Sequence, residues 1–196
     1  KGWQKPDRIV VRADSPARLA GFQQAAPGVE FVAAKDEAAA LALIADADAL
    51  IGFCEPDLVA AGKQLRWIQL LTAGAGPCSA IPEVRQRGIV VTNMQRIAGP
   101  ELAEHSLAML LAFTRGLNTW LPQQKLGRWD QSAFPMRSMW ELQGRTMLVV
   151  GLGGIGTELA ERANGLGMRV IATRASAAEK PFFVDYVGRP DELLRL

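Results

Sequence analysis

Hydrophobic positions in the first half of the chain come in short runs, separated by segments rich in alanine and polar residues. Each run combines β-branched, leucine or aromatic residues, as buried strands do, and the segments between the runs have the composition of helices. Strands that alternate with helices predict a parallel sheet covered on both faces. The predicted strands are Arg8–Arg12, Glu30–Ala33, Ala49–Gly52, Trp67–Leu71 and Ile89–Thr92.

The pattern changes at Pro100, which suits the first turn of a helix. This helix should extend to about Leu117, and its part from Leu107 to Phe113 is apolar on nearly all sides. A helix of that kind is typical of a buried contact between two bodies. We therefore predict a domain boundary here, with one domain over residues 1–98 and a second over residues 99–196.

The segment Leu121–Gln143 combines loop-forming residues with large apolar side chains. Leaving these side chains in water costs about 25 cal/mol for each Å² exposed. The segment therefore either packs on its own domain or forms a contact with a second subunit. The residues concerned are Pro122, Gly127 and Pro135 among the loop formers, and Trp129, Phe134, Met136, Met139 and Trp140 among the apolar ones.

A second strand–helix–strand pattern lies further on, with predicted strands at Thr146–Val150 and Arg169–Thr173 and a helix at Thr157–Leu166. Glycines in G-x-G-x-x-G spacing join the first strand to the helix. In such a turn the first glycine permits a tight bend, the second lets a pyrophosphate approach, and the third lets helix and strand pack closely. The helix start also offers free N–H groups to phosphate. The predicted dinucleotide-binding residues are Gly151, Gly153, Gly154, Ile155 and Gly156.

The end of the second strand bears on the choice of dinucleotide. Thr173 closes the strand and Arg174 follows it, where a site for NAD would carry an acidic residue. A guanidinium suits a 2′-phosphate, and Ser176 lies close behind. We therefore predict NADP in preference to NAD, with Thr173, Arg174 and Ser176 in the site. The alternative is a solvated arginine at a strand end.

Composition excludes several classes of function. The 196 residues are 49% hydrophobic and 21% charged, enough for one large or two small globular domains. The net charge is +2 with a pI near 8.7, and the basic residues are scattered, so nothing favours nucleic acid. The longest strongly apolar run is far shorter than the roughly 20 residues of a membrane span, and no signal peptide opens the chain. We predict a cytoplasmic protein that does not bind membranes.

The two cysteines and the single histidine give no metal site. Cys54 and Cys78 are too far apart for a C-x-x-C pair, and no cysteine lies near His105. We interpret both cysteines as buried reduced thiols, the usual environment of free cysteine. His105 is interpreted as a core or helix-capping residue, the alternative being an assisting role near a cleft.

The order of these parts resembles that of the D-isomer-specific 2-hydroxyacid dehydrogenases, of the glyoxylate and hydroxypyruvate reductase type. The resemblance implies a flavodoxin-like substrate domain with a parallel sheet, followed by a Rossmann-type dinucleotide-binding domain that we expect to be incomplete here. It also implies a homodimer through the cofactor domain and the 121–143 segment. The stretches that carry it are Pro100–Leu111, Gly127–Trp129, Glu141–Thr146 and Val150–Gly156.

The same resemblance implies that the loop Thr72–Gly76 holds the carboxylate of the substrate through its backbone amides. Physical chemistry agrees, because the loop follows a parallel strand and its consecutive small residues can form an anion-binding nest, although taken alone it is only a turn. The predicted substrate-binding residues are Ala73, Gly74, Ala75 and Gly76.

Family members transfer a hydride between a nicotinamide cofactor and a small 2-oxo or 2-hydroxy acid of the D configuration. The resemblance implies that their catalytic histidine, carboxylate and arginine lie later in the cofactor domain. We expect that segment to be missing before Leu196, so no catalytic residue is assigned and His105 does not substitute. Arg96, near the hinge, is a further residue that could reach substrate. The alternative function is a non-catalytic, dinucleotide-sensing protein of the same fold, as in related corepressors.

Overall fold

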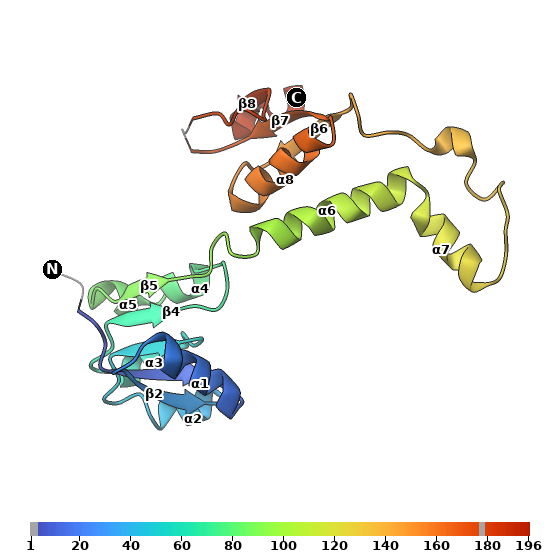
Figure 1. Cartoon of the computed structure of the whole chain (residues 1–196). Helices are drawn as coiled ribbons and strands as arrows, with labels where there is room; N and C mark the ends of the chain where they lie inside the picture. The colour runs from blue at the N-terminus through green and yellow to red at the C-terminus, as the bar shows by residue number, and fades with distance from the viewer. Residues whose placement is uncertain (1–3, 177–178) are drawn as a thin grey trace. The chain divides into compact units, whose positions relative to one another are not determined.

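The structure is a computed structural model that describes residues 4–176 and 179–196. The chain divides into two compact units, Lys1–Gln95 and Arg96–Leu196, which we call unit 1 and unit 2 (Figure 1). The division falls between Gln95 and Arg96, close to the boundary that the sequence suggests.

Unit 1 contains a five-stranded parallel sheet in the order β2-β1-β3-β4-β5. This order is that of flavodoxin-like folds. All five strands expected from the hydrophobic pattern are confirmed, and the largest difference is that β4 is two residues shorter. The strands are β1 (Arg8–Arg12), β2 (Glu30–Ala34), β3 (Ala49–Ile51), β4 (Trp67–Gln69) and β5 (Val90–Thr92).

Helices cover both faces of this sheet. Because side chains alternate along a strand, Val10 of β1 packs into one hydrophobic cluster with Leu50 and Ile68, while Ile9 and Val11 pack into another. The inner strands β1 and β3 are therefore buried on both sides, as their uninterrupted apolar runs predict, whereas the edge strand β5 is largely exposed. The helices of unit 1 are α1 (Pro16–Ala25), α2 (Glu37–Leu41), α3 (Pro56–Ala61), α4 (Gly76–Ser79) and α5 (Pro82–Gln86).

Asp48, just before β3, connects the starts of neighbouring strands. Its carboxylate accepts hydrogen bonds from the backbone N–H groups of Asp7, at 2.8 Å, and Arg8, at 3.1 Å, and from Arg66 Nε at 3.2 Å. Burial raises the pKa of Asp48, but these donors together outweigh burial and hold the pKa below its ordinary value. The ionised carboxylate therefore stabilises unit 1.

Replacing Asp48 with asparagine should lower the free energy of unfolding of unit 1 at neutral pH by about 1–2 kcal/mol. Because the pKa of Asp48 is depressed in the folded state, its contribution is present above about pH 4 and is lost as the pH falls through the folded pKa. Hydrogen exchange of β1 and β3 in the two proteins measures the difference. A difference that stayed constant down to about pH 2 would contradict this account.

Unit 2 has a three-stranded parallel sheet in the order β6-β7-β8, with α8 between its first two strands in sequence. Helix α6 packs against α8. The elements are α6 (Gly99–Thr114), α7 (Leu117–Lys125), η1 (Met136–Ser138), β6 (Thr146–Val150), α8 (Gly154–Gly165), β7 (Arg169–Thr173), β8 (Tyr186–Gly188) and η2 (Pro190–Arg195).

Helix α6 differs from the expectation that it is buried on nearly all sides. Ala103 and Leu107 are buried, but Met109 and Phe113 are exposed. The helix also ends earlier, because Gly116 adopts a positive φ of 70°. Helix α7 begins directly after Gly116 and extends into the segment that was expected to be loop. In the described residues, no helix has the length and apolar character needed to cross a membrane.

Candidate functional site

The glycine turn, which we define as residues 151–156, joins β6 to α8. Gly151 has a φ of +99°, a conformation that favours glycine. The N–H groups of Gly151 and Leu152 donate to the carbonyl of Thr173, at 3.2 and 2.8 Å, which holds the turn against β7. A Cβ atom on Gly156 would overlap the carbonyl oxygen of Gly151. The turn therefore needs glycine at its first and last positions for its own geometry.

The middle of the glycine turn is open. Within the part of the chain that the structure describes, the N–H groups of Gly153, Gly154 and Ile155 form no hydrogen bond. A Cβ atom added to Gly153 would have no atom within 4 Å. Free N–H groups at the start of a 12-residue helix attract anions, and the lack of a side chain leaves room for one to approach. This is the arrangement that a pyrophosphate needs.

Arg96 lies beside this turn, within unit 2. A Cβ atom on Gly154 would come 2.8 Å from Arg96 Cγ, so the arginine side chain covers that glycine. Arg96 is also the one non-glycine residue of the described chain with a positive φ, 73°. The sequence suggested Arg96 as a residue that could reach substrate, and the structure places its side chain against the turn.

Thr173 supports the glycine turn from β7. Its side chain is buried, and its hydroxyl accepts a hydrogen bond from Gly151 N at 3.3 Å. This hydroxyl therefore helps to fix the turn, and its place in the dinucleotide site stays a prediction.

A pocket of about 400 Å³ opens where β7 and β8 end. The two strands are parallel, and Arg174 N donates to the Gly188 carbonyl at 3.0 Å, so the residues after both strands meet. The guanidinium of Arg174 donates to the carbonyls of Ser176, at 3.2 Å, and Glu179, at 3.3 Å. Two further cations, Lys180 and Arg189, line the pocket, and the sequence analysis did not identify them. The lining residues are Arg174, Ala175, Ser176, Lys180, Asp185, Tyr186, Val187, Gly188 and Arg189.

Glu192 lies beside this pocket and fixes its rim. The backbone N–H of Arg189 donates to Glu192 Oε1 at 2.6 Å, and the Tyr186 hydroxyl donates to Oε2 at 2.5 Å. The first of these bonds, helped by the second, lowers the pKa of Glu192. The bond to Glu192 raises the pKa of Tyr186. At neutral pH the pair is therefore a carboxylate and a neutral phenol.

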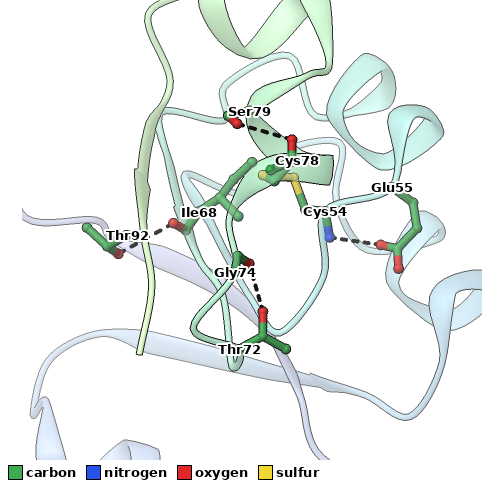
Figure 2. The surroundings of a disulfide bond; sticks show 9 residues. Cys54, Glu55, Ile68, Thr72, Gly74, Cys78, Ser79 and Thr92 are labelled. Carbon is green, nitrogen blue, oxygen red and sulfur yellow. Dashed lines mark hydrogen bonds between the residues drawn. A yellow bond between two sulfur atoms is a disulfide. The ribbon is translucent and has the colours of Figure 1, made fainter. Parts of the chain in front are cut away.

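In unit 1, the loop that the sequence predicts to hold substrate, residues 72–76, follows β4, and we call it the substrate loop after that prediction. Its start is held by Met94 N, which donates to the Thr72 carbonyl at 3.1 Å, and by Asn93 Nδ2, which donates to the Ala73 carbonyl at 2.8 Å. The Thr72 hydroxyl bonds to the Gly74 carbonyl, as Figure 2 shows. No hydrogen bond from the N–H groups of Gly74, Ala75 or Gly76 occurs among the described residues. Three neighbouring free donors fit an anion-binding nest.

The two cysteines form a disulfide, so the interpretation as reduced thiols is wrong (Figure 2). Cys54 follows β3 and Cys78 lies in α4, which follows β4. Because β3 and β4 are parallel neighbours, the segments after them leave the same edge of the sheet, and the two Cα atoms lie 5.5 Å apart. The separation of 24 residues conceals this contact in the sequence. Cys78 is buried, as expected of a cysteine.

His105 is exposed on α6, so the expectation of a core histidine is wrong. Its neighbour Glu104 forms an ion pair with Arg162 of α8, at 3.9 Å. Among the residues that the structure describes, no group of three or more His, Cys, Asp and Glu side chains could hold a metal ion.

Known proteins share this combination of parts. Residues 107–195 match the D-isomer specific 2-hydroxyacid dehydrogenase, NAD binding domain. A D-isomer specific 2-hydroxyacid dehydrogenase family protein from Aeromonas salmonicida superposes on 96% of this chain and 59% of its own, with a TM-score of 0.80 and 27% identity. The chain is a relative of the D-isomer specific 2-hydroxyacid dehydrogenases. The resemblance and the α/β fold with a Rossmann-type second unit are therefore confirmed.

Two curated relatives of this chain show how much of each protein the similarity covers. Hydroxypyruvate reductase of Thermotoga maritima is 31% identical over 131 residues, which are 67% of this chain and 42% of that protein. Glyoxylate reductase of Korarchaeum cryptofilum is 28% identical over 193 residues, which are 92% of this chain and 57% of that protein. The chain thus spans about half the length of these relatives.

Proposed function

We propose that this chain belongs to an oxidoreductase that transfers a hydride between a nicotinamide dinucleotide and a small 2-oxo or D-2-hydroxy acid. The observation that carries the proposal is the glycine turn, whose free N–H groups open a helix inside the stretch that matches the NAD-binding domain. The reductase activities of the two curated relatives support it. The alternative of a dinucleotide sensor has no support among them. The cytoplasmic location remains a prediction from the sequence.

The residues of the glycine turn fit the diphosphate of a dinucleotide. The N–H groups of Gly153, Gly154 and Ile155 would donate to its oxygens, and the cation of Arg96 would add positive charge beside them. When bound, the nicotinamide supplies or accepts the hydride. The chain's own part is to bind and orient the two ligands, since the catalytic acid–base histidine, carboxylate and arginine of the resemblance are assigned to no residue here.

For the dinucleotide we propose NADP over NAD. Support comes from the pocket at the ends of β7 and β8, where Arg174, Lys180 and Arg189 line the space and Ser176 offers a hydroxyl. A 2′-phosphate carries the negative charge that such a lining favours. The acidic side chain in the lining, Asp185, is engaged by the backbone N–H of Val170 at 2.8 Å.

For the substrate we propose that the N–H groups of the substrate loop bind the carboxylate. The expected result of titrating the full chain with oxamate, an analogue of a 2-oxoacid, is an NMR shift change confined to the loop. Gly74→Ala should weaken oxamate binding about tenfold or more, because the added methyl has free space in the chain itself but obstructs the anion.

Gly21→Ala is the matched control for this titration, because Gly21 lies in α1 and its Cβ position is equally open. It should bind oxamate as the wild type does. Shift changes that map elsewhere, or a Gly74→Ala protein that binds like the wild type, would reject the loop as the carboxylate site.

We also propose a homodimer that uses the exposed apolar surface of α6 and the 121–143 segment. Trp120 stacks on Trp129 with ring centroids 6.1 Å apart, and these rings, with Phe134, line a cavity of about 470 Å³ that also includes Met136. Met136 is 81% exposed and Phe113 is 64% exposed. So much clustered apolar surface fits a second copy better than water.

Met136→Glu should shift the wild-type dimer to monomer in sedimentation velocity, because it places a charge on an exposed side chain that lines the cavity of this surface. Leu194→Glu is the control, since Leu194 is even more exposed, at 99%, but lies in η2. A wild-type chain that sediments as a monomer, or equal dissociation by both variants, would contradict the proposed dimer surface.

A further inference from the structure

The disulfide lies next to the substrate loop. Cys78 is two residues beyond Gly76, the last residue of the loop, and Cys54 belongs to the connection between β3 and α3. Figure 2 shows the bond between these two segments, together with Thr72 and Gly74 of the loop. The bond therefore connects the substrate loop covalently to the neighbouring strand connection.

The two ends of the loop are held in different ways. Hydrogen bonds from Asn93 and Met94 hold the first end. At the other end, Ser79 N donates to the Ala75 carbonyl at 2.9 Å, so the loop continues directly into α4. A helix of four residues is not stable by itself, so its position depends on tertiary anchors. The disulfide is the covalent anchor of α4.

The loop also depends on α4 for its donor geometry. Ala75 is partly buried against the same core cluster that contains Cys78, whereas Gly74 and Gly76 are exposed. The packing of Ala75 and Cys78, together with that of Ile81 just after α4, attaches this end of the loop to the core. Opening the disulfide leaves that end of the loop with noncovalent contacts alone.

We propose that Cys54–Cys78 is a reversible thiol–disulfide modification site that controls the order of residues 72–80. Its oxidised form holds the loop ready for an anion, and its reduced form releases it. The consequence for carboxylate affinity rests on the proposed function of the loop. In a reducing compartment a disulfide is transient and regulatory, and in an oxidising one it is permanent, so the same bond reports the redox state of its surroundings.

The reductant is a dithiol, of the kind that protein disulfide reductases and small dithiols supply. One of its thiolates attacks Sγ of Cys54, the more exposed of the pair, and the S–S bond breaks to leave the Cys78 thiolate. The second thiol of the reductant then displaces the Cys54 thiolate and closes the reductant's own disulfide. Two electrons pass from the dithiol to the cysteine pair, and its two protons end on Cys54 and Cys78.

Hydrogen–deuterium exchange on the full chain tests this inference. The oxidised protein should protect residues 72–80, and a dithiol should raise their exchange while β1 and β2 serve as the internal reference. Removal of the dithiol and reoxidation should restore protection. The double variant Cys54→Ser/Cys78→Ser should exchange like the reduced form with or without dithiol. In parallel, the oxamate dissociation constant should rise about tenfold on reduction, the cost of ordering a residue or two of loop.

The outcomes separate the switch from the carboxylate assignment. Exchange that does not respond to the dithiol, or two reactive thiols in the denatured but unreduced chain, would overturn the switch. If exchange responds reversibly while oxamate binds neither form, the switch is supported and the proposed carboxylate site fails. The reduction and reoxidation of the wild type decide the matter even if the double variant does not fold.

Discussion

Gly156→Ala should destabilise unit 2 by about 3 kcal/mol or more, at the upper end of what overpacking costs. The added methyl would overlap the carbonyl oxygen of Gly151 and approach Val149 Cγ1 to 3.1 Å. Neither neighbour can move freely, because Gly151 is bonded through its N–H to Thr173 and Val149 is buried in β6. Hydrogen exchange of β6 and β7 measures the loss without assuming that the two units unfold together.

Gly153→Ala is the matched control in the same turn. Its Cβ position has no atom within 4 Å, and its φ is negative, so this variant should keep the stability of the wild type. If both substitutions lowered protection of β6 equally, or neither did, the distinct roles of the two glycines would be refuted.

Arg174→Asp should reverse the preference of the chain between NADPH and NADH. A hydrogen bond to a charged group contributes about 1.5–3 kcal/mol, so the wild type should favour NADPH by about tenfold to a hundredfold. The aspartate repels a 2′-phosphate and can accept hydrogen bonds from the ribose hydroxyls of NADH. Both effects favour NADH, so the ratio of the two dissociation constants should change by more than the loss of one contact alone would produce.

Dissociation constants for both dinucleotides, on wild type and variant, measure this reversal. Arg115→Asp is the control, since it makes the same change of charge at an exposed residue after α6. It should leave the preference of the wild type intact. A wild type that binds NADH as well as NADPH would show that Arg174 is a solvated charge at a strand end.

The sequence was sufficient for the strands because their signal is local. A strand buried on both faces needs an unbroken apolar run, and each of the five runs in unit 1 became a strand. The apolar pattern of α6 was ambiguous for a physical reason. An apolar pattern indicates that a surface is covered, but not whether the same chain or a second copy covers it. The exposure of Met109 and Phe113 within the chain could therefore not be predicted.

The site shows the same division between local and long-range information. The spacing of Gly151, Gly153 and Gly156 follows from a turn of six residues, and the sequence identified it. The position of Arg96 against Gly154 and the disulfide depend on segments brought together by the fold. Adjacent parallel strands could have suggested that Cys54 and Cys78 meet, because each follows one strand of the pair β3 and β4, but strand order was needed first.

The central claim is that the glycine turn of unit 2 holds the diphosphate of a nicotinamide dinucleotide. It is tested most directly by titrating NADPH calorimetrically into the full chain and into Gly153→Ala, whose fold should be unchanged. The wild type should bind NADPH, and Gly153→Ala should bind it about tenfold more weakly or worse, since the methyl occupies the space where the diphosphate approaches. Absence of binding by the wild type, or equal affinities for the two proteins, would contradict it.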